Sequence, residues 1–327
     1  MCVCHTRALR GCTASLSQTT PNTASFSPLA ALWDYRGGCA NTLSLRGHKN
    51  AVLRVAWLAA GAGQLATASA DRTCAVWDAP SGARLRTLTG HERIVNDVAA
   101  GAAREAGSHA LASASDDGSV LLWDARARRA AGAVPGRAPL LACAYGADAH
   151  TLYCAGVEGV VRAYDLRGGS GGSSGGSSGG QLLPVLTLED GGGGVSSLAA
   201  SPNGFQLLAL GFDGVARTYD VQAFCAAPSR CTGALGAARA PGAGGGGAGA
   251  GGLFDSGLLR ASWSPCGQRV CVGGSDKVAR VYEAASGQLL AELPGHTGAV
   301  VEGTWHPEEP VLATAGDRTV FIGELSR

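Results

Sequence analysis

The stretch SADRTCAVWD, residues 69–78, decides the fold because the chain uses its pattern twice. It returns as SDDGSVLLWD at residues 115–124. In both copies an Asp follows the Ser by two positions, and Trp-Asp begins six positions beyond that Asp. A spacing that is kept in two places indicates a structural unit that the chain repeats.

Relatives of the Trp-Asp pair recur along most of the chain. They are Trp33-Asp34, Trp77-Asp78, Trp123-Asp124, Tyr164-Asp165, Tyr219-Asp220, Tyr282-Glu283 and Gly323-Glu324. Four of the six intervals between them lie close to a period of about 40–45 residues, which is typical of repeat architectures. The two longer intervals, on either side of Tyr219, contain the glycine-rich tracts 168–180 and 241–252. Without its tract the first returns to the period and the second nearly does, so the chain carries seven repeats.

Two further features accompany the markers. An acid stands six positions before the marker in the last six repeats, at Asp71, Asp117, Glu158, Asp213, Asp276 and Asp317. In three repeats a Gly-His pair stands upstream at a similar distance from the marker, with the histidines His48, His91 and His296. Acids and histidines at such regular distances favour one structural unit over chance.

Short apolar stretches lie between these markers, such as QLATAS (64–69) and CAVWD (74–78). Each has the length of a β-strand and ends at Gly, Asp or Ser, and each repeat holds four of them. A four-stranded sheet cannot bury both of its faces alone, so the copies must stack, and radial stacking of such sheets gives a β-propeller. The sequence therefore predicts an all-β fold, a seven-bladed β-propeller.

We expect the first blade to be incomplete. LRGC (9–12) stands where Leu-Arg-Gly-His would be, but Cys12 is closer to Trp33 than His48 is to Trp77 in the next repeat. The difference corresponds to one missing strand. We therefore assign residues 29–327 to the propeller and interpret residues 1–28 as a disordered or degenerate N-terminal segment.

The tracts 168–180 and 241–252 are predicted to be flexible insertions, because glycine and serine offer too little apolar surface to offset the entropy of ordering. GGSGG (168–172) formally matches a nucleophile elbow, and GAGGGG (242–247) formally matches a dinucleotide fingerprint. Neither lies in a strand-turn-helix context, so both are interpreted as linkers. The first tract follows a third strand and the second precedes an innermost strand, which predicts that they lie on opposite rims.

The Gly-His and Trp-Asp signatures resemble those of the WD-repeat family, and the resemblance covers about residues 29–327. In that family the imidazole, a hydroxyl, a carboxylate and the indole N–H of one blade form a hydrogen-bonded chain. Such a set acts as a unit, because each buried polar atom left unpaired costs about 1–3 kcal/mol. The resemblance implies one set of His48, Ser69, Asp71 and Trp77, another of His91, Ser115, Asp117 and Trp123, and a third with His296 and Asp317.

A catalytic triad is the other interpretation of a His, Ser and Asp set. The set recurs in separate repeats, however, and a triad gives Trp no role. We therefore predict no catalytic residue. Cys2, Cys4, His5 and Cys12 are of the types that bind zinc, but incidental cysteines in a tail explain them as well. We predict no metal, no cofactor and no small-molecule substrate.

Composition limits the remaining classes of function. The chain has 327 residues, 46% of them apolar, with a formal charge of +1 and no long basic stripe, which argues against a large nucleic-acid footprint. Eleven scattered cysteines, an odd number, favour reduced thiols in the cytosol or nucleus. No apolar run reaches the roughly 20 residues that span a bilayer. Residues 1–28 contain arginines and no acid, a composition that also suits an organelle transit peptide.

Segments near the C-terminus point to one branch of the WD-repeat family. Residues 258–277, 289–317 and FIGEL (321–325) resemble the branch found in the U5 small nuclear ribonucleoprotein, and so does YDVQAFCAAPSRC (219–231). The ending Gly323-Glu324 in place of Trp-Asp is shared with that branch. The resemblance implies a nuclear, non-catalytic scaffold in pre-mRNA splicing. It would bind the large U5 core protein and other spliceosomal proteins, with RNA contacted indirectly and no membrane involved.

Exposed turn residues beside the anchors are the candidates for partner binding: Asn50, Arg72, Arg93, Asp116, Thr297 and Arg318. Two other classes stay open. SVLLWDAR (119–126) resembles the box by which some propellers dock on the adaptor of a cullin–RING ubiquitin ligase, which would make the protein a substrate receptor. An enzyme is the third class. Purification of bound partners separates the first two classes, and turnover with no partner present would indicate the third.

Overall fold

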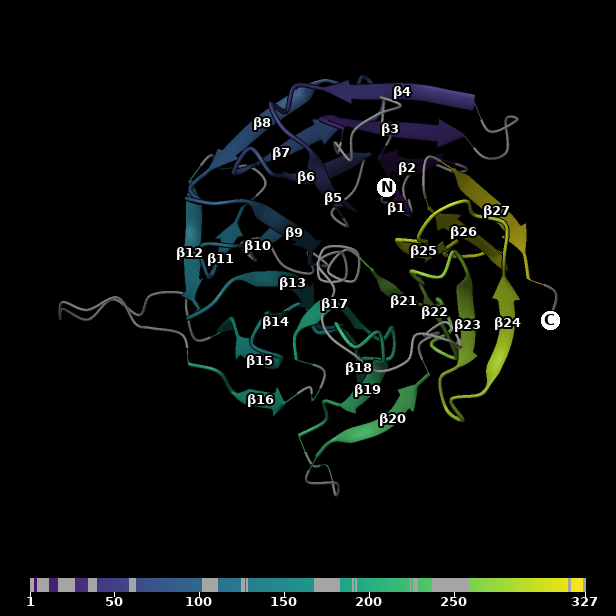
Figure 1. The fold of residues 1–327 in the computed structure, drawn as a ribbon. Helices are drawn as coiled ribbons and strands as arrows, with labels where there is room; N and C mark the ends of the chain where they lie inside the picture. Colours follow the sequence, from purple (N-terminus) through teal and green to yellow (C-terminus); the bar gives the residue numbers. More distant parts are fainter. Residues whose placement is uncertain are drawn as a thin grey trace, which may run out of the picture.

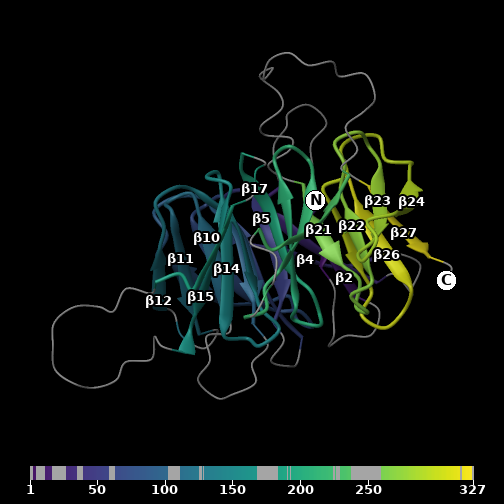
Figure 2. The same ribbon diagram turned by 90° about the horizontal axis from the view of Figure 1, so that it is seen from below.

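The computed structural model describes residues 3–4, 12–16, 27–34, 40–58, 63–101, 111–124, 127, 129–167, 183–189, 191, 193–223, 225, 229–236, 259–316 and 319–325. These residues form 27 β-strands in a ring of sheets around a central axis (Figure 1). From the side, the strands run between the two faces of the ring (Figure 2). Within these ranges no helix is long and apolar enough to cross a membrane. The predicted all-β propeller is confirmed.

Six sheets have four antiparallel strands each, taken in chain order from the centre of the ring outward (Figure 1). The first sheet contains β1 (Val3–Cys4), β2 (Cys12–Leu16), β3 (Leu29–Asp34) and β4 (Ala40–Arg46). The second contains β5 (Val52–Trp57), β6 (Gln64–Ser69), β7 (Thr73–Asp78) and β8 (Arg84–Thr89). The third contains β9 (Val95–Ala100), β10 (Leu111–Ser115), β11 (Ser119–Trp123) and β12 (Ala130–Pro135).

The remaining sheets continue in the same order. The fourth contains β13 (Leu140–Tyr145), β14 (Thr151–Gly156), β15 (Val160–Asp165) and β16 (Leu186–Glu189). The fifth contains β17 (Val195–Ala200), β18 (Gln206–Gly211), β19 (Ala216–Asp220) and β20 (Cys231–Leu235). The sixth contains β21 (Ala261–Trp263), β22 (Arg269–Val272), β23 (Ala279–Glu283) and β24 (Leu289–Leu293). The last sheet contains β25 (Glu302–Trp305), β26 (Val311–Ala315) and β27 (Val320–Glu324).

Two parts of the sequence prediction need correction. The structure has six four-stranded blades rather than seven, because the repeat that ends at Gly323-Glu324 forms a sheet of three described strands. The first sheet is not the incomplete one: β1 and β2 pair with each other, and β2 pairs with β3 from Cys12 opposite Asp34 to Leu16 opposite Ala30. The spacing detected a missing strand but assigned it to the wrong end of the ring, because the very short β1 carries no recognisable apolar pattern. The predicted insertions 168–180 and 241–252 lie outside the described residues.

The apolar core lies between neighbouring sheets rather than within one sheet. Between the second and third sheets, Val76 and Leu88 pack in one cluster with Val95, Leu111 and Trp123. All five are at most 1% exposed. Burial of both faces of each inner strand against the next sheet explains why a repeat cannot fold without its neighbours.

The innermost strands meet in a buried ionic network near the axis. Arg54 of β5 lies 3.2 Å from the Asp97 carboxylate of β9 and also pairs with Glu302 of β25. Arg260, just before β21, lies 3.3 Å from the other carboxylate oxygen of Asp97, which also accepts the backbone N–H of Cys143 at 3.0 Å. The side chains of Asp97, Arg260 and Glu302 are 3–6% exposed. One carboxylate thus links strands from four sheets of the ring.

Candidate functional site

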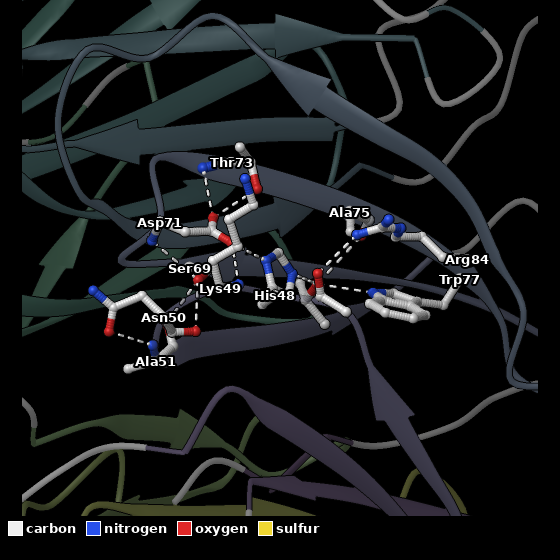
Figure 3. A network of polar contacts seen from close by, with 12 residues as sticks. His48, Lys49, Asn50, Ala51, Ser69, Asp71, Thr73, Ala75, Trp77 and Arg84 are labelled. Carbon is white, nitrogen blue, oxygen red and sulfur yellow. Dashed lines mark hydrogen bonds and ion pairs between the residues drawn. The ribbon is translucent and has the colours of Figure 1, made fainter.

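The first polar set lies in the second sheet and is built by three elements (Figure 3). His48 stands just before β5, Asp71 in the turn between β6 and β7, and Trp77 near the end of β7. His48 Nδ1 lies 2.9 Å from Asp71 Oδ2, and His48 Nε2 lies 2.7 Å from Thr67 Oγ1 on β6. Trp77 Nε1–H donates to the same hydroxyl at 2.9 Å. Imidazole, carboxylate, hydroxyl and indole therefore form one continuous chain.

The hydrogen atoms of this chain have a single consistent arrangement. The Asp71 carboxylate can only accept, so His48 Nδ1–H donates to it. In a neutral imidazole Nε2 then accepts, and its donor is the Thr67 hydroxyl, whose oxygen in turn accepts from the Trp77 indole. The other Asp71 oxygen accepts from the Thr73 backbone N–H and hydroxyl, so the polar atoms of the set are bonded within the sheet.

Burial and hydrogen bonding set the ionisation of this group. Burial lowers the pKa of His48, and this effect outweighs the hydrogen bond and the charge of Asp71. Burial acts in the opposite direction on Asp71, but hydrogen bonds from the Thr73 side chain, the Lys49 backbone N–H and His48 outweigh it and hold the pKa of Asp71 at about 2. At neutral pH the set therefore holds a neutral imidazole and an ionised carboxylate.

The third sheet repeats the arrangement. His91 Nδ1 lies 2.8 Å from Asp117 Oδ2, and His91 Nε2 lies 2.7 Å from Ser113 Oγ, which accepts from Trp123 Nε1 at 2.8 Å. Burial raises the pKa of Asp117, but hydrogen bonds from Ser119 and His91 outweigh it and hold the pKa at about 2. Two sheets thus carry the same set with a different hydroxyl residue.

The family resemblance implied Ser69 and Ser115 as the bridging hydroxyls, and the structure corrects this assignment. The bridging hydroxyls belong to Thr67 and Ser113, two residues earlier in the second strand of each sheet. At that position the hydroxyl reaches both the imidazole and the indole. Ser69 instead donates to Ala51 O at 2.8 Å and accepts the backbone N–H of Asp71 at 3.1 Å. Ser115 accepts the backbone N–H of Asp117 at 3.2 Å. Both serines therefore fix the turn that carries the acid.

The last sheet has a reduced form of the set. His296 Nε2 lies 2.9 Å from Thr314 Oγ1, and Nδ1 lies 3.0 Å from Thr319 Oγ1. A glycine stands at the Trp position, and Phe321 supplies the ring contact instead, edge to face with His296 at 4.6 Å between centroids. Asp317 lies outside the described residues.

In the fourth, fifth and sixth sheets an arginine takes over the partner role of the histidine. Each of these three repeats carries an arginine four positions after its acid, on the third strand, and the two form an ion pair. The pairs are Glu158–Arg162, Asp213–Arg217 and Asp276–Arg280. Sequence reasoning missed these arginines, although the repeated spacing of acid and arginine was visible in all three repeats.

The acid turns and the segments that enter the innermost strands lie on the same rim of the ring, as the hydrogen bond from Lys49 N–H to Asp71 shows. Four of the candidate binding residues are exposed on this rim: Asn50, Arg72, Arg93 and Thr297. Asp116 is half-buried, and its carboxylate accepts a hydrogen bond from the Asn96 side chain at 2.7 Å. Part of the carboxylate is therefore already used within the protein and is less available to a partner. Arg318 lies outside the described residues.

The backbone at this rim is unusual in two of its turns. The residue after the acid has a positive φ in five sheets, and in three of them it is a glycine: Gly118, Gly159 and Gly214. Arg72 and Lys277 adopt the same conformation, with φ of 70° and 73°. A side chain costs free energy in this region of φ, so two basic residues are held on the rim at some expense of stability.

The described part of the chain holds no cluster of metal ligands, and several of its cysteines are buried. No cluster of three or more His, Cys, Asp or Glu residues there could hold a metal ion. The side chains of Cys2, Cys4, His5 and Cys12 are outside that part. Among the free cysteines, burial raises the pKa of Cys74, like those of Cys154 and Cys271, to about 12, which keeps these thiols protonated at neutral pH.

The box at residues 119–126 is buried where a ligase adaptor would need it exposed. Val120, Leu122 and Trp123 lie in β11 and are at most 2% exposed, since they pack in the core between sheets. Arg126 lies outside the described residues. The apolar part of the box therefore serves the fold.

Comparison with known proteins agrees with this architecture. Residues 38–78, 82–124 and 287–322 match the family described as WD domain, G-beta repeat. These segments include the parts of the chain that hold the three histidines of the polar sets.

Longer matches connect the chain to named proteins. It is 28% identical over 295 residues to the U5 small nuclear ribonucleoprotein 40 kDa protein of Dictyostelium discoideum, which covers 90% of this chain and 75% of that protein. It is 29% identical over 296 residues to pre-mRNA-splicing factor cwf17 of Schizosaccharomyces pombe, covering 90% and 78%. The human U5 40 kDa protein is 38% identical over 73 residues, 22% of this chain and 20% of that protein. The ring of sheets, the repeated polar sets and the family match identify residues 38–78, 82–124 and 287–322 as WD repeats.

Proposed function

We propose that the protein is a non-catalytic scaffold of pre-mRNA splicing that acts in the nucleus and binds the large core protein of the U5 small nuclear ribonucleoprotein. One observation carries the proposal. About nine-tenths of the chain is similar to each of two proteins, one named as a 40 kDa protein of the U5 small nuclear ribonucleoprotein and the other as a pre-mRNA-splicing factor. Similarity of this length involves the whole ring rather than a single repeat.

The geometry of the polar sets supports a scaffold over an enzyme. The histidines, hydroxyls and carboxylates that could serve catalysis are used by one another inside the sheets. The side chains that remain available, such as Arg72 and Arg93, stand on a rim whose backbone is fixed by the same hydrogen bonds. A rigid rim that displays exposed side chains suits docking of a protein without large rearrangement.

Protein contact is also favoured over direct contact with RNA. The formal charge of the chain is +1, with 26 basic and 25 acidic residues. Proteins that bind RNA through its phosphates use an excess of basic side chains, which this chain does not have. RNA is therefore contacted indirectly, through the protein partner.

The test is a pull-down of the purified protein with the U5 core protein and, separately, with U5 RNA alone. Arg72→Glu and Arg93→Glu, on the proposed rim, are compared with Arg129→Glu, an exposed arginine between the third and fourth strands and thus on the opposite rim. We expect capture of the core protein, lost in the first two variants and retained in the third. Tight, salt-sensitive capture of naked RNA without the core protein would refute the proposal.

The alternative raised by residues 119–126, a substrate receptor of a cullin–RING ligase, is disfavoured because Val120, Leu122 and Trp123 are buried. Purification of the protein from cells with its partners separates the two functions. U5 proteins are expected in the bound fraction. An adaptor and a cullin there, with no U5 proteins, would favour the ligase.

A further inference from the structure

Basic side chains follow the rim that carries the acid turns, from the first sheet to the fourth. Five of them are exposed in the connecting segments and turns of this rim: Arg46 at the end of β4, Lys49 before β5, Arg72 between β6 and β7, Arg93 before β9 and Arg137 before β13. The four sheets are neighbours in the ring (Figure 1). We call these five residues the basic arc.

The charges of the basic arc are not neutralised within the described part of the chain. None of the five side chains forms an ion pair there. The acids Asp71 and Asp117 are used in the polar sets, and Glu92 is the one exposed acid in the described connecting segments and turns that carry the arc. Five basic side chains thus stand against one acid, on a chain whose formal charge is +1.

The opposite rim of the same sheets carries charges of both signs. Arg167 pairs there with Asp165 at 2.9 Å. The same rim exposes Asp148, in the turn between β13 and β14, as well as Arg129. Positive charge is therefore concentrated on one rim, and a surface of one sign favours a partner of the opposite sign.

The apolar side chains of this rim favour a polypeptide over a nucleic acid. Ile94 is 39% exposed beside Arg93. Val157, whose backbone N–H donates to Pro139 O beside the end of the arc, is 40% exposed. Proteins that bind single-stranded RNA place aromatic side chains among the basic ones, for stacking on bases. The exposed phenylalanines of the described chain, Phe205 and Phe321, belong to the fifth and last sheets instead.

We propose that the basic arc binds an extended acidic segment of a protein partner, rich in aspartate and glutamate and interrupted by one aliphatic residue that packs against Ile94. The identity of the partner rests on the proposed function, whereas the chemistry of its segment rests on the arc alone. The surface is held ready for docking, because Asp71 and Asp117 accept the backbone N–H groups of Lys49 and Glu92 at 2.9 and 3.0 Å.

The probe is a fluorescent peptide with the sequence EEDELEDEE, added to the purified full chain and followed by fluorescence anisotropy. We expect saturable binding that weakens as salt is raised, and no binding of the reversed-charge peptide KKRKLKRKK. Arg93→Glu should weaken binding of the acidic peptide about fivefold or more. Arg129→Glu, on the opposite rim, is the matched control and should leave binding unchanged.

Two further variants separate binding from folding. Arg72→Gly removes one charge and also relieves the positive φ of 70°, so it should weaken binding about two- to fivefold without lowering the melting temperature. Ile94→Asp should weaken binding about fivefold or more, because it removes the apolar contact and adds a like charge. Leu85→Asp, at an equally exposed leucine of the outer strand β8, is its control and should have no effect.

Absent binding of the acidic peptide, or binding insensitive to Arg72, Arg93 and Ile94, overturns the proposal. A nine-nucleotide uridine RNA that binds more tightly than the peptide and displaces it also overturns it, because the arc then takes nucleic acid. The pull-down with the U5 core protein distinguishes this inference from the proposed function. Peptide binding without capture of the core protein refutes the proposed partner and keeps the acidic segment, whereas capture that excess peptide does not displace refutes the segment.

Discussion

Each histidine set depends on one hydroxyl that lies between two rings. Thr67 Oγ1 contacts both the His48 imidazole and the Trp77 indole, at 2.7 Å and 2.9 Å. No other described side chain bonds that indole, and Ser69 is directed to the backbone of the neighbouring segment. The hydroxyl is therefore the member of the set whose loss leaves two polar groups without a partner.

Thr67→Val keeps the shape of the side chain and removes the hydroxyl. We expect it to lower the free energy of unfolding by about 1–3 kcal/mol, because His48 Nε2 and the Trp77 N–H stay buried and unpaired. Thr89→Val, on the exposed face of β8, is the control and should change stability by less than about 0.5 kcal/mol. Urea denaturation of both variants checks the difference. Equal stabilities would mean that the hydroxyl is not needed.

Low pH should lower the stability of the fold by protonating Asp71 and Asp117, whose carboxylates are held ionised in the folded protein. The pKa of Asp71 and that of Asp117 are about 2 in the folded protein, below the ordinary value of 3.8. A lowered folded-state pKa gives stability that is fully present above the unfolded value and is lost as pH falls through the folded one. Stability should therefore drop between about pH 4 and pH 2. Melting curves across this range should show a smaller drop for Asp71→Asn than for the unaltered chain.

Neither Thr67 nor Ser113 could be chosen from the sequence, for a geometric reason. Alternate residues of a strand share a face, so Thr67 and Ser69 both point to the side on which His48 lies. Spacing cannot tell which of the two is level with the indole. Packing of the rings decides this, and packing is visible only in the folded sheet.

At the scale of elements, the third strand of each sheet has its own irregularity. In five sheets the pairing with the fourth strand shifts by one residue immediately before the aromatic marker, at Trp33, Trp77, Trp123, Tyr219 and Tyr282. A bulge turns a side chain to a new direction at small cost in pairing. This shift directs the aromatic ring into the sheet interface. The regular spacing of the markers therefore records a repeated backbone feature that apolar patterning does not reveal.

The ion pairs that replace histidine in three sheets should differ in strength with their burial. The Arg280 and Asp276 side chains are each 14% exposed, and Arg280 also pairs with Glu292. Arg162 and Glu158 are 23% and 32% exposed. Arg280→Ala should cost about 1.5–3 kcal/mol, the range for hydrogen bonds to charged groups, and Arg162→Ala less than about 1 kcal/mol. Denaturation curves that rank the two variants the other way would contradict this.

At the scale of the whole molecule, the repeat period identified the propeller, because radial stacking is the solution open to short four-stranded units. The structure has six four-stranded blades rather than the predicted seven, and the incomplete sheet is the last rather than the first. The last marker lies on a third strand that has no fourth beside it in the described chain. The position of the incomplete sheet depends on how the first and last sheets of the ring divide the strands between them. A single repeat carries no information about this division.

The ionic network at the axis should carry a large part of the stability of the ring. Asp97→Ala leaves Arg260, the Cys143 N–H and one side of Arg54 without their carboxylate. Removing one partner of a buried pair costs about 3–5 kcal/mol. Asp165→Ala, whose partner Arg167 is largely exposed, is the control and should have little effect. Thermal unfolding that shows equal melting temperatures for the two variants would disprove the central role of Asp97.

The order of strands in the sheets has a mechanical consequence. Every described sheet is assembled from strands that are consecutive in the chain, and the first and last sheets have no described strand in common. Among the described strands, side-chain packing rather than strand pairing therefore holds the first and last sheets together at that joint. If the two ends of the chain were pulled apart, the joint would part first and the sheets would detach from either end. Single-molecule stretching should then show a series of separate force peaks instead of one collective rupture.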